Sequence, residues 1–295
     1  MDEPEKYFVP EPSKWPIIAA VGLFVLAIGA ATCFHNDPYG PYILSIGIFI
    51  LIYMMSGWFG AVIYESRSGY YNMQIYRTFR WAMFWFIFSE VMFFAGFFGA
   101  LFYARNFSVP WLGGEGALNK LGTHEFLWPA FIAQWPLLNN PNPQLFPNPL
   151  HSMPPLWLPL FNTFALLLSS ITITIAHHAL FANRRRLLAV MLVATIILGV
   201  TFLLLQGFEY HEAYTEFKMS LASGIYGTTF FMLTGFHGAH VTIGTIMLIT
   251  IWVRCLYGHF TPEHHFAFQA AAWYWHFVDV VWLCLFIYVY VLPLR

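Results

Sequence analysis

The chain has 295 residues, of which 59% are hydrophobic and only 9% carry a charged side chain. A soluble globular domain carries roughly 25% charged residues, so this composition excludes an ordinary soluble domain. The formal net charge is −1. It supplies no basic field that could neutralise a run of phosphates, which excludes nucleic acid as a partner.

Seven apolar segments are long enough to cross a bilayer as helices. A helix needs about 20 mostly apolar residues to cross a hydrocarbon core of about 30 Å. Continuous apolar runs predict helices, because the strands of a membrane barrel alternate apolar and polar residues. We therefore predict an all-α membrane protein with spans over residues 15–34, 41–64, 79–104, 156–182, 187–206, 222–256 and 270–292. The sixth span is too long for a perpendicular crossing, so we expect it to tilt, project into water or break near its start.

The basic residues predict which way the chain crosses the membrane. Seven spans place the two termini on opposite sides, and cytoplasmic loops carry an excess of lysine and arginine. The N-terminal side holds nine basic residues: Lys6, Lys14, Arg67, Arg77, Arg80, Arg184, Arg185, Arg186 and Arg254. The other side holds four: Arg105, Lys120, Lys218 and Arg295. We therefore expect a cytoplasmic N-terminus, or its equivalent in a mitochondrial matrix, and a C-terminus on the opposite, periplasmic side.

A long proline-rich segment separates the third and fourth predicted spans. Residues 105–155 contain nine prolines, each of which removes a backbone donor and fixes φ. We therefore expect neither helix nor sheet there. The segment is either a cap, packed on the outer face through its aromatic side chains, or a variable external loop.

Glu90 is an ionisable residue near the middle of the third predicted span. No other charged residue lies between Arg80 and Arg105. An ionised carboxylate at that depth costs about 2.5–3.5 kcal/mol on insertion scales, so Glu90 should face the protein interior, protonated or hydrogen-bonded. It is either a proton-handling or lipid-contacting group, or a structural hydrogen bond between helices.

Two polar pairs stand in the last two predicted spans. His237 and His240 are three residues apart, as are His276 and Asp279, so each pair shares one helical face. Two histidines and a carboxylate can form a metal site, and His240 with His276 could bind one haem iron axially. We favour a buried polar network without a metal, because the chain has no H-E-x-x-H motif, calcium loop or C-x-x-C-H haem attachment. A transporter that uses Glu90 as its proton site should show repeated halves, and the sequence shows none.

Several stretches of the chain resemble subunit III of the haem-copper cytochrome c oxidases. The longest are YGTTFF at 226–231, TGFHGAHV at 234–241 and AAWYWHFVDVVW at 271–282. Shorter blocks are SEV at 89–91, AHH at 176–178 and EYHEA at 209–213. The resemblance runs from about Trp58 to the C-terminus, and its motifs are long enough to be specific.

The resemblance implies a fold of two parts. A cytoplasmic tail over residues 1–14 precedes a two-helix unit over residues 15–65. An inner loop over residues 66–78 leads to a five-helix bundle over residues 79–295, which carries the outer loop 105–155. The two-helix unit leans away from the bundle and leaves a V-shaped cleft filled by phospholipid.

The resemblance also implies a function. Subunit III is a non-catalytic subunit of a proton-pumping terminal oxidase of aerobic respiration. It flanks the catalytic subunit I, supports its proton uptake and protects its turnover. Subunit II, possibly a small subunit IV, and cytochrome c through the complex are the further partners. The haems and copper lie in partner subunits, and bound phospholipid is the only ligand expected in this chain.

Individual residues carry over from the family pattern. The lipid-binding positions match Trp58, Glu65, Arg80, Arg254 and His259, and the buried carboxyl group matches Glu90. Tyr70 and Tyr71 replace a histidine pair of the mitochondrial members, which implies loss of a headgroup contact. That departure and the longer outer loop indicate a bacterial member in the inner membrane. The presence of all seven spans favours the cytochrome c branch over the quinol oxidases, which usually keep five.

Overall fold

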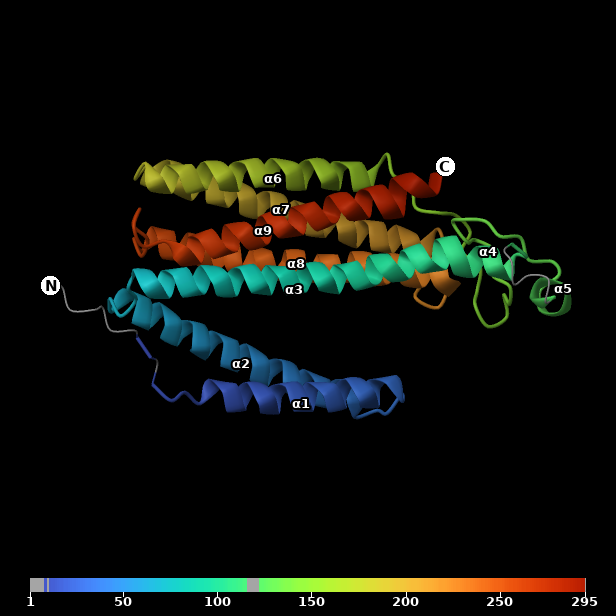
Figure 1. The fold of residues 1–295 in the computed structure, drawn as a ribbon, viewed down its shortest axis with the longest axis horizontal. Helices are drawn as coiled ribbons and strands as arrows, with labels where there is room; N and C mark the ends of the chain where they lie inside the picture. Colours follow the sequence, from blue (N-terminus) through green and yellow to red (C-terminus); the bar gives the residue numbers. More distant parts are fainter. Residues whose placement is uncertain (1–7, 10, 116–121, 295) are drawn as a thin grey trace. The chain divides into compact units, whose positions relative to one another are not determined.

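The computed structural model describes residues 8–9, 11–115 and 122–294. The described residues contain helices and no strand, and the chain divides into two compact units, Met1–Trp81 and Ala82–Arg295. Seven helical spans in the described part are long and apolar enough to cross a membrane, which confirms the predicted all-α, seven-span fold. The helices that make these spans are α1 (Trp15–Phe34), α2 (Gly40–Arg67), α3 (Met73–Tyr103), α6 (Leu158–Phe181), α7 (Arg185–Thr215), α8 (Gly224–Leu256) and α9 (Phe266–Leu285) (Figure 1). The lipid-filled cleft stays a prediction.

In the first unit, α1 and α2 pack backbone against backbone through glycines. A Cβ atom added at Gly29 would lie 2.4 Å from the backbone nitrogen of Leu44, and one at Gly47 would lie 2.6 Å from that of Leu26. Small residues at such positions let two membrane helices approach closely. After α2, Gly69 turns the chain with a φ of 76°, a conformation that costs glycine little.

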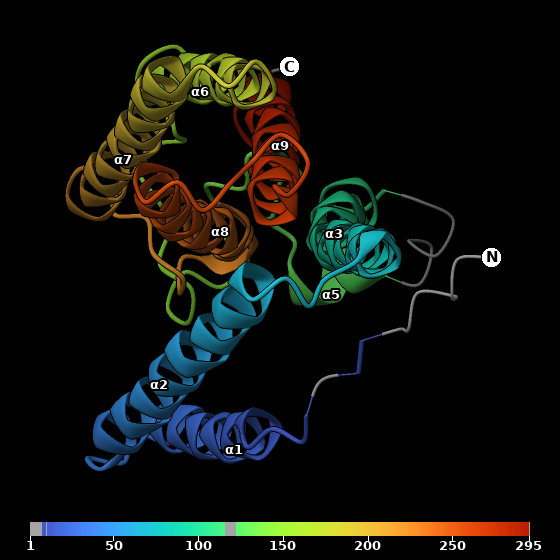
Figure 2. The ribbon, with the colours of Figure 1, turned by 90° about the vertical axis from the view of Figure 1, so that its left-hand side faces the viewer.

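In the second unit, α6, α7, α8 and α9 surround one core, and α3 lies beside α8 and α9 (Figure 2). Trp275 of α9 is completely buried, and its Nε1 donates a 2.8 Å hydrogen bond to Ser169 Oγ of α6. The indole occupies space left by two glycines, since a Cβ atom at Gly199 of α7 or Gly244 of α8 would lie within 2.9 Å of the ring. One tryptophan thus contacts all three neighbouring helices.

The third span differs from its predicted bounds at both ends. It begins at Met73 and continues past Tyr103 through a π-helix, η1 (Ala104–Ser108), and a short helix, α4 (Val109–Leu112). A further helix, α5 (Thr123–Leu127), follows. The expectation of no helix over residues 105–155 was therefore wrong for these segments. Pro110 stands in the first turn of α4, where its missing N–H needs no helical partner.

Other spans also correct the predicted bounds. α6 begins at Leu158 and α9 begins at Phe266, so each starts a few residues from where hydropathy placed it. α7 continues beyond residue 206 to Thr215, because polar residues end an apolar run without ending a helix. α8 is a single helix of 33 residues, so the broken alternative is wrong.

The proline-rich segment after α5 caps the end of the bundle where α7 ends and α8 begins. Leu150 N–H donates to the Phe217 carbonyl oxygen at 2.8 Å, and the Asn140 amide donates to the Ser223 carbonyl oxygen at 3.3 Å. Phe131 and Met153 are buried in the core of the second unit. The structure therefore supports the cap.

Candidate functional site

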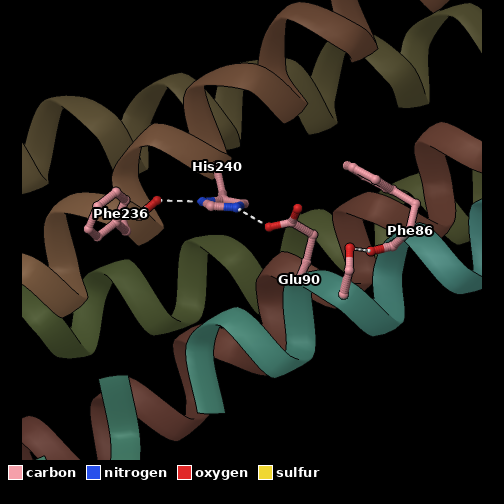
Figure 3. Close-up of polar contacts among 5 residues, drawn as sticks. Phe86, Glu90, Phe236 and His240 are labelled. Atoms are coloured by element: carbon pink, nitrogen blue, oxygen red, sulfur yellow. Dashed lines mark hydrogen bonds and ion pairs between the residues drawn. The ribbon is translucent and has the colours of Figure 1, made fainter. Parts of the chain in front are cut away.

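Glu90 of α3 and His240 of α8 form a hydrogen-bonded pair between two helices (Figure 3). Glu90 Oε2 lies 2.8 Å from His240 Nε2, and the two side chains are 22% and 13% exposed. The other ring nitrogen, Nδ1, lies 2.6 Å from the Phe236 carbonyl oxygen. A carbonyl oxygen can only accept, so Nδ1 carries a hydrogen, and Nε2 and the Glu90 carboxyl group share a single proton. In the structure the Glu90 carboxyl group is hydrogen-bonded between two helices, one of the two states that the sequence analysis expected, and its side chain is partly exposed.

Aromatic side chains surround this pair. Phe93 and Phe94 follow Glu90 by three and four residues, so they lie on the same face of α3. Their ring centroids lie 6.0 and 5.0 Å from that of His240. Tyr274 of α9 stacks on the imidazole at 6.3 Å. An apolar wall of this kind strengthens the hydrogen bond and makes an unpaired charge costly.

Ser170 of α6 joins His276 and Asp279 of α9. Ser170 Oγ lies 2.8 Å from His276 Nδ1 and donates to Asp279 Oδ2. The sequence indicated that His276 and Asp279 share a helical face, and the structure shows that they meet through this serine. The sequence analysis missed Ser170, because a serine in an apolar helix carries no signal of a partner 106 residues away.

His237 makes a separate contact. It is completely buried, and its Nε2 lies 3.1 Å from the Val278 carbonyl oxygen of α9. The four polar residues of the last two spans therefore contact three different elements: His237 contacts α9, His240 contacts α3, and His276 with Asp279 contacts α6. The structure does not bring all four together.

The hydrogen bonds of the two His240 ring nitrogens argue against the haem alternative. An axial ligand must offer one ring nitrogen to the iron, and both nitrogens of His240 already lie in hydrogen bonds. The haem alternative is therefore not supported. Among residues 8–9, 11–115 and 122–294, no three His, Cys, Asp or Glu side chains converge as a metal site would require.

Three predicted lipid-binding residues lie in the first unit. Trp58 is 45% exposed on α2, and Arg80 is exposed on α3. Glu65 accepts a 2.7 Å hydrogen bond from the Tyr71 hydroxyl group. Burial raises the pKa of Tyr71 above its ordinary value, and the bond to Glu65 raises it further. The sequence marked Tyr71 only as a departure from the family and missed this pairing.

The other two, Arg254 and His259, lie together at the C-terminal end of α8. The guanidinium carbon of Arg254 lies 4.5 Å above the ring centroid of Phe260, and the residue is only 8% exposed. His259 N–H donates to the Arg254 carbonyl oxygen at 3.0 Å. A cation at this position interacts favourably with the helix dipole.

Glu209 of α7 is a further buried acid that the residue-by-residue reading missed. It is 0% exposed, and its carboxyl group faces the hydroxyl group of Tyr290. Apart from its place in the EYHEA block, nothing in the sequence predicts that Glu209 is buried, because it follows the apolar run of α7, where surface residues are expected.

Comparisons with known proteins cover nearly the whole chain. A family model described as "Cytochrome c oxidase subunit III" matches residues 5–293. "Cytochrome c oxidase subunit 3" of Papio hamadryas is 40% identical over 285 residues, which cover 96% of each chain. That of Dugong dugon is 39% identical over 285 residues, and that of Lumbricus terrestris is 38% identical over 287 residues, or 97% of each chain. The similarity extends over both compact units.

Proposed function

Because this chain belongs to the cytochrome c oxidase subunit III family and is thus a membrane subunit of an oxidoreductase complex, we propose that it supports proton uptake by catalytic subunit I. In this proposal Glu90 and His240 are the residues that hold the proton. Subunit I is the main partner, and subunit II and a small subunit IV are further partners. Cytochrome c reaches this chain only through the complex, whose haems and copper lie in the partner subunits.

The observation that carries the proposal is the 2.8 Å contact between Glu90 Oε2 and His240 Nε2, which we infer to share a single proton. Moving that proton across the 2.8 Å between Nε2 and Oε2 changes no net charge in the membrane. The Glu90 side chain is 22% exposed, so the helices of this chain do not enclose it completely. The apolar rings around the pair exclude competing partners for it.

The test is Glu90→Gln in the assembled oxidase, with steady-state turnover and proton uptake as the readouts. The amide keeps the shape and a hydrogen bond to His240 but cannot release a proton, so we expect slower proton uptake. Ser89→Ala is the matched control, because among the described residues that hydroxyl group bonds only to the Phe86 carbonyl oxygen of its own helix. Wild-type turnover and unchanged bound lipid in Glu90→Gln would contradict the proposed role of Glu90 in proton uptake.

A second part of the proposal is that the chain binds anionic phospholipid. Arg254 and His259 stand at one helix end, where a cation suits a phosphate headgroup at the membrane surface. In the first unit, Arg80 supplies a cation and Trp58 an exposed amphipathic ring, with Glu65 nearby in sequence. Replacing Arg80 and Arg254 by alanine should lower the lipid load seen by native mass spectrometry. An unchanged load would contradict this assignment.

We also propose that the chain lies in a bacterial inner membrane with its N-terminus in the cytoplasm and its C-terminus in the periplasm. The distribution of nine basic residues against four supports this orientation. Single cysteines at Ser68 and Ser152, in the turns on the predicted inner and outer sides, provide a test. A membrane-impermeant thiol reagent added to intact cells should label the cysteine at 152 and spare the one at 68, and the reverse pattern would invert the orientation.

A further inference from the structure

A polar notch interrupts the outer surface of α6 and α9 halfway along these helices. We define it as Ser170 and Thr174 of α6 together with His276 of α9. Ser170 lies near the middle of the span Leu158–Phe181, and His276 lies near the middle of the span Phe266–Val291. The notch therefore lies deep in the bilayer, away from either aqueous surface.

The surface around the notch is apolar and exposed. α6 and α9 run side by side in both views (Figures 1 and 2), joined by the bonds of Trp275 and Ser170. On this face the exposed fractions are 62% for Phe164, 57% for Ile171, 39% for Ile175 and 60% for Val280. Either lipid or another membrane helix covers these side chains.

Counting protons shows that His276 lacks a full partner for Nε2. The Ser170 hydroxyl group has one hydrogen, which it donates to Asp279 Oδ2. His276 Nδ1 must therefore carry a hydrogen and donate it to Ser170 Oγ, which leaves Nε2 of the neutral ring as a bare acceptor. The nearest described partner is Thr174 Oγ1 at 3.5 Å, the outer limit of a hydrogen bond. Thr174 already donates to the Ser170 carbonyl oxygen at 2.8 Å. Among the described residues, Nε2 thus has no hydrogen-bond donor except Thr174 Oγ1 at that limiting distance, and Thr174 gives its hydrogen to Ser170.

We propose that the α6–α9 face docks a membrane-spanning helix of another oxidase subunit, which brings a hydrogen-bonding side chain to His276 Nε2. The inference rests on the proposed function, in which the chain works inside an oxidase complex. Lipid acyl chains have no hydrogen-bonding group, and the bilayer core has no water to replace one. Polar side chains that cross between membrane helices fill this need.

The exposed face of α7 is a contrast within the same unit. Ile197 and Leu204 are 59% and 61% exposed, as apolar as the α6–α9 face. The one hydroxyl group between them, that of Thr201, donates to the Ile197 carbonyl oxygen of its own helix at 2.8 Å. Nothing on that face requires a partner, so it suits lipid.

Site-specific photocrosslinking tests the occupant of the face. A photoreactive benzophenone amino acid replaces Ile171 or Val280 in the full oxidase, in its native membrane, and Ile197 provides the control. We expect a covalent adduct with another oxidase subunit from positions 171 and 280, and lipid adducts from position 197. Lipid adducts alone at 171 and 280, or equal protein adducts at 197, would overturn the proposal.

The same samples separate this proposal from the proposed function. Haem-copper subunits that co-purify with the wild-type chain, without a protein adduct at 171 or 280, would refute the docking face alone. Their absence from the wild-type preparation would refute both.

Retention in the purified complex gives an independent readout. His276→Phe should lower the fraction of this chain retained about fivefold, the effect of one interhelical hydrogen bond in a membrane. His276→Gln should restore retention, because its amide can still hydrogen-bond across the interface. Thr201→Val on α7 should have no effect. Equal retention of His276→Phe and the wild-type chain would count against the proposal.

Discussion

Replacing the two partners of the Glu90–His240 pair, singly and together, measures what their contact contributes to the free energy of unfolding. Glu90→Met and His240→Phe keep roughly the volume of each side chain but remove the hydrogen bond. Each single change leaves one buried polar group without its partner, which costs about 1–3 kcal/mol. The double change removes both groups, so its cost should be less than the sum of the two.

The structure indicates how far the cost of the double change should fall below the sum of the two single costs. The side chains are 22% and 13% exposed, but at mid-span that exposed part meets acyl chains, which satisfy no hydrogen bond, so the full range applies to each single cost. Interhelical hydrogen bonds in membrane proteins have coupling energies of about 0.6 kcal/mol on average and about 1.7 at most. We expect a coupling energy of about 1 kcal/mol, because the pair shares one proton within an aromatic wall. A dry ion pair would be stronger, since removing one partner of a buried salt bridge costs about 3–5 kcal/mol.

The assay is reversible unfolding in mixed micelles, with the free energy of unfolding measured for all four variants. A second cycle pairs Glu90→Met with Thr201→Val on α7, where the two costs should add within about 0.5 kcal/mol. A coupling energy within error of zero would show that the contact is not made. A value above about 3 kcal/mol would show instead that the shared proton lies on His240 and that the two residues form an ion pair.

Two further predictions concern the first unit. Gly29→Ala places a methyl group 2.4 Å from the Leu44 backbone nitrogen, so it should destabilise the α1–α2 pair by about 1–3 kcal/mol in a thermal melt. Gly60→Ala, whose added methyl group meets nothing within 4 Å, should be neutral or stabilising, and equal melting of both variants would contradict this packing. Tyr71 has a pKa above its ordinary value of 10.0. Its contribution to the free energy of unfolding is therefore complete below pH 10 and is lost as the pH rises above 10. The free energy of unfolding should fall more steeply above pH 10 in the wild-type chain than in Tyr71→Phe, because phenylalanine has no hydroxyl group to bond Glu65. Parallel pH profiles of the two chains would exclude that bond.

Helix ends were the least predictable part of the fold. Hydropathy ended the third span at residue 104 and the fifth at 206, whereas the helices continue to Leu112 and Thr215. A membrane selects apolar residues only within its core, while backbone hydrogen bonding continues a helix into water or under a cap. The expectation that Pro110 excludes a helix was wrong for a related reason, because a proline in the first turn of a helix does not stop that helix.

The sequence by itself determined the number of spans, the helical class and the need of Glu90 for a polar partner. Each follows from the cost of placing polar backbone or a carboxylate in hydrocarbon, which depends on local composition alone. Only the tertiary structure decided the partners: His240 for Glu90 across 150 residues, and Ser170 for His276 and Asp279 across more than 100. A hydrogen bond is set by the distance and angle between two atoms, and these depend on how separate helices pack.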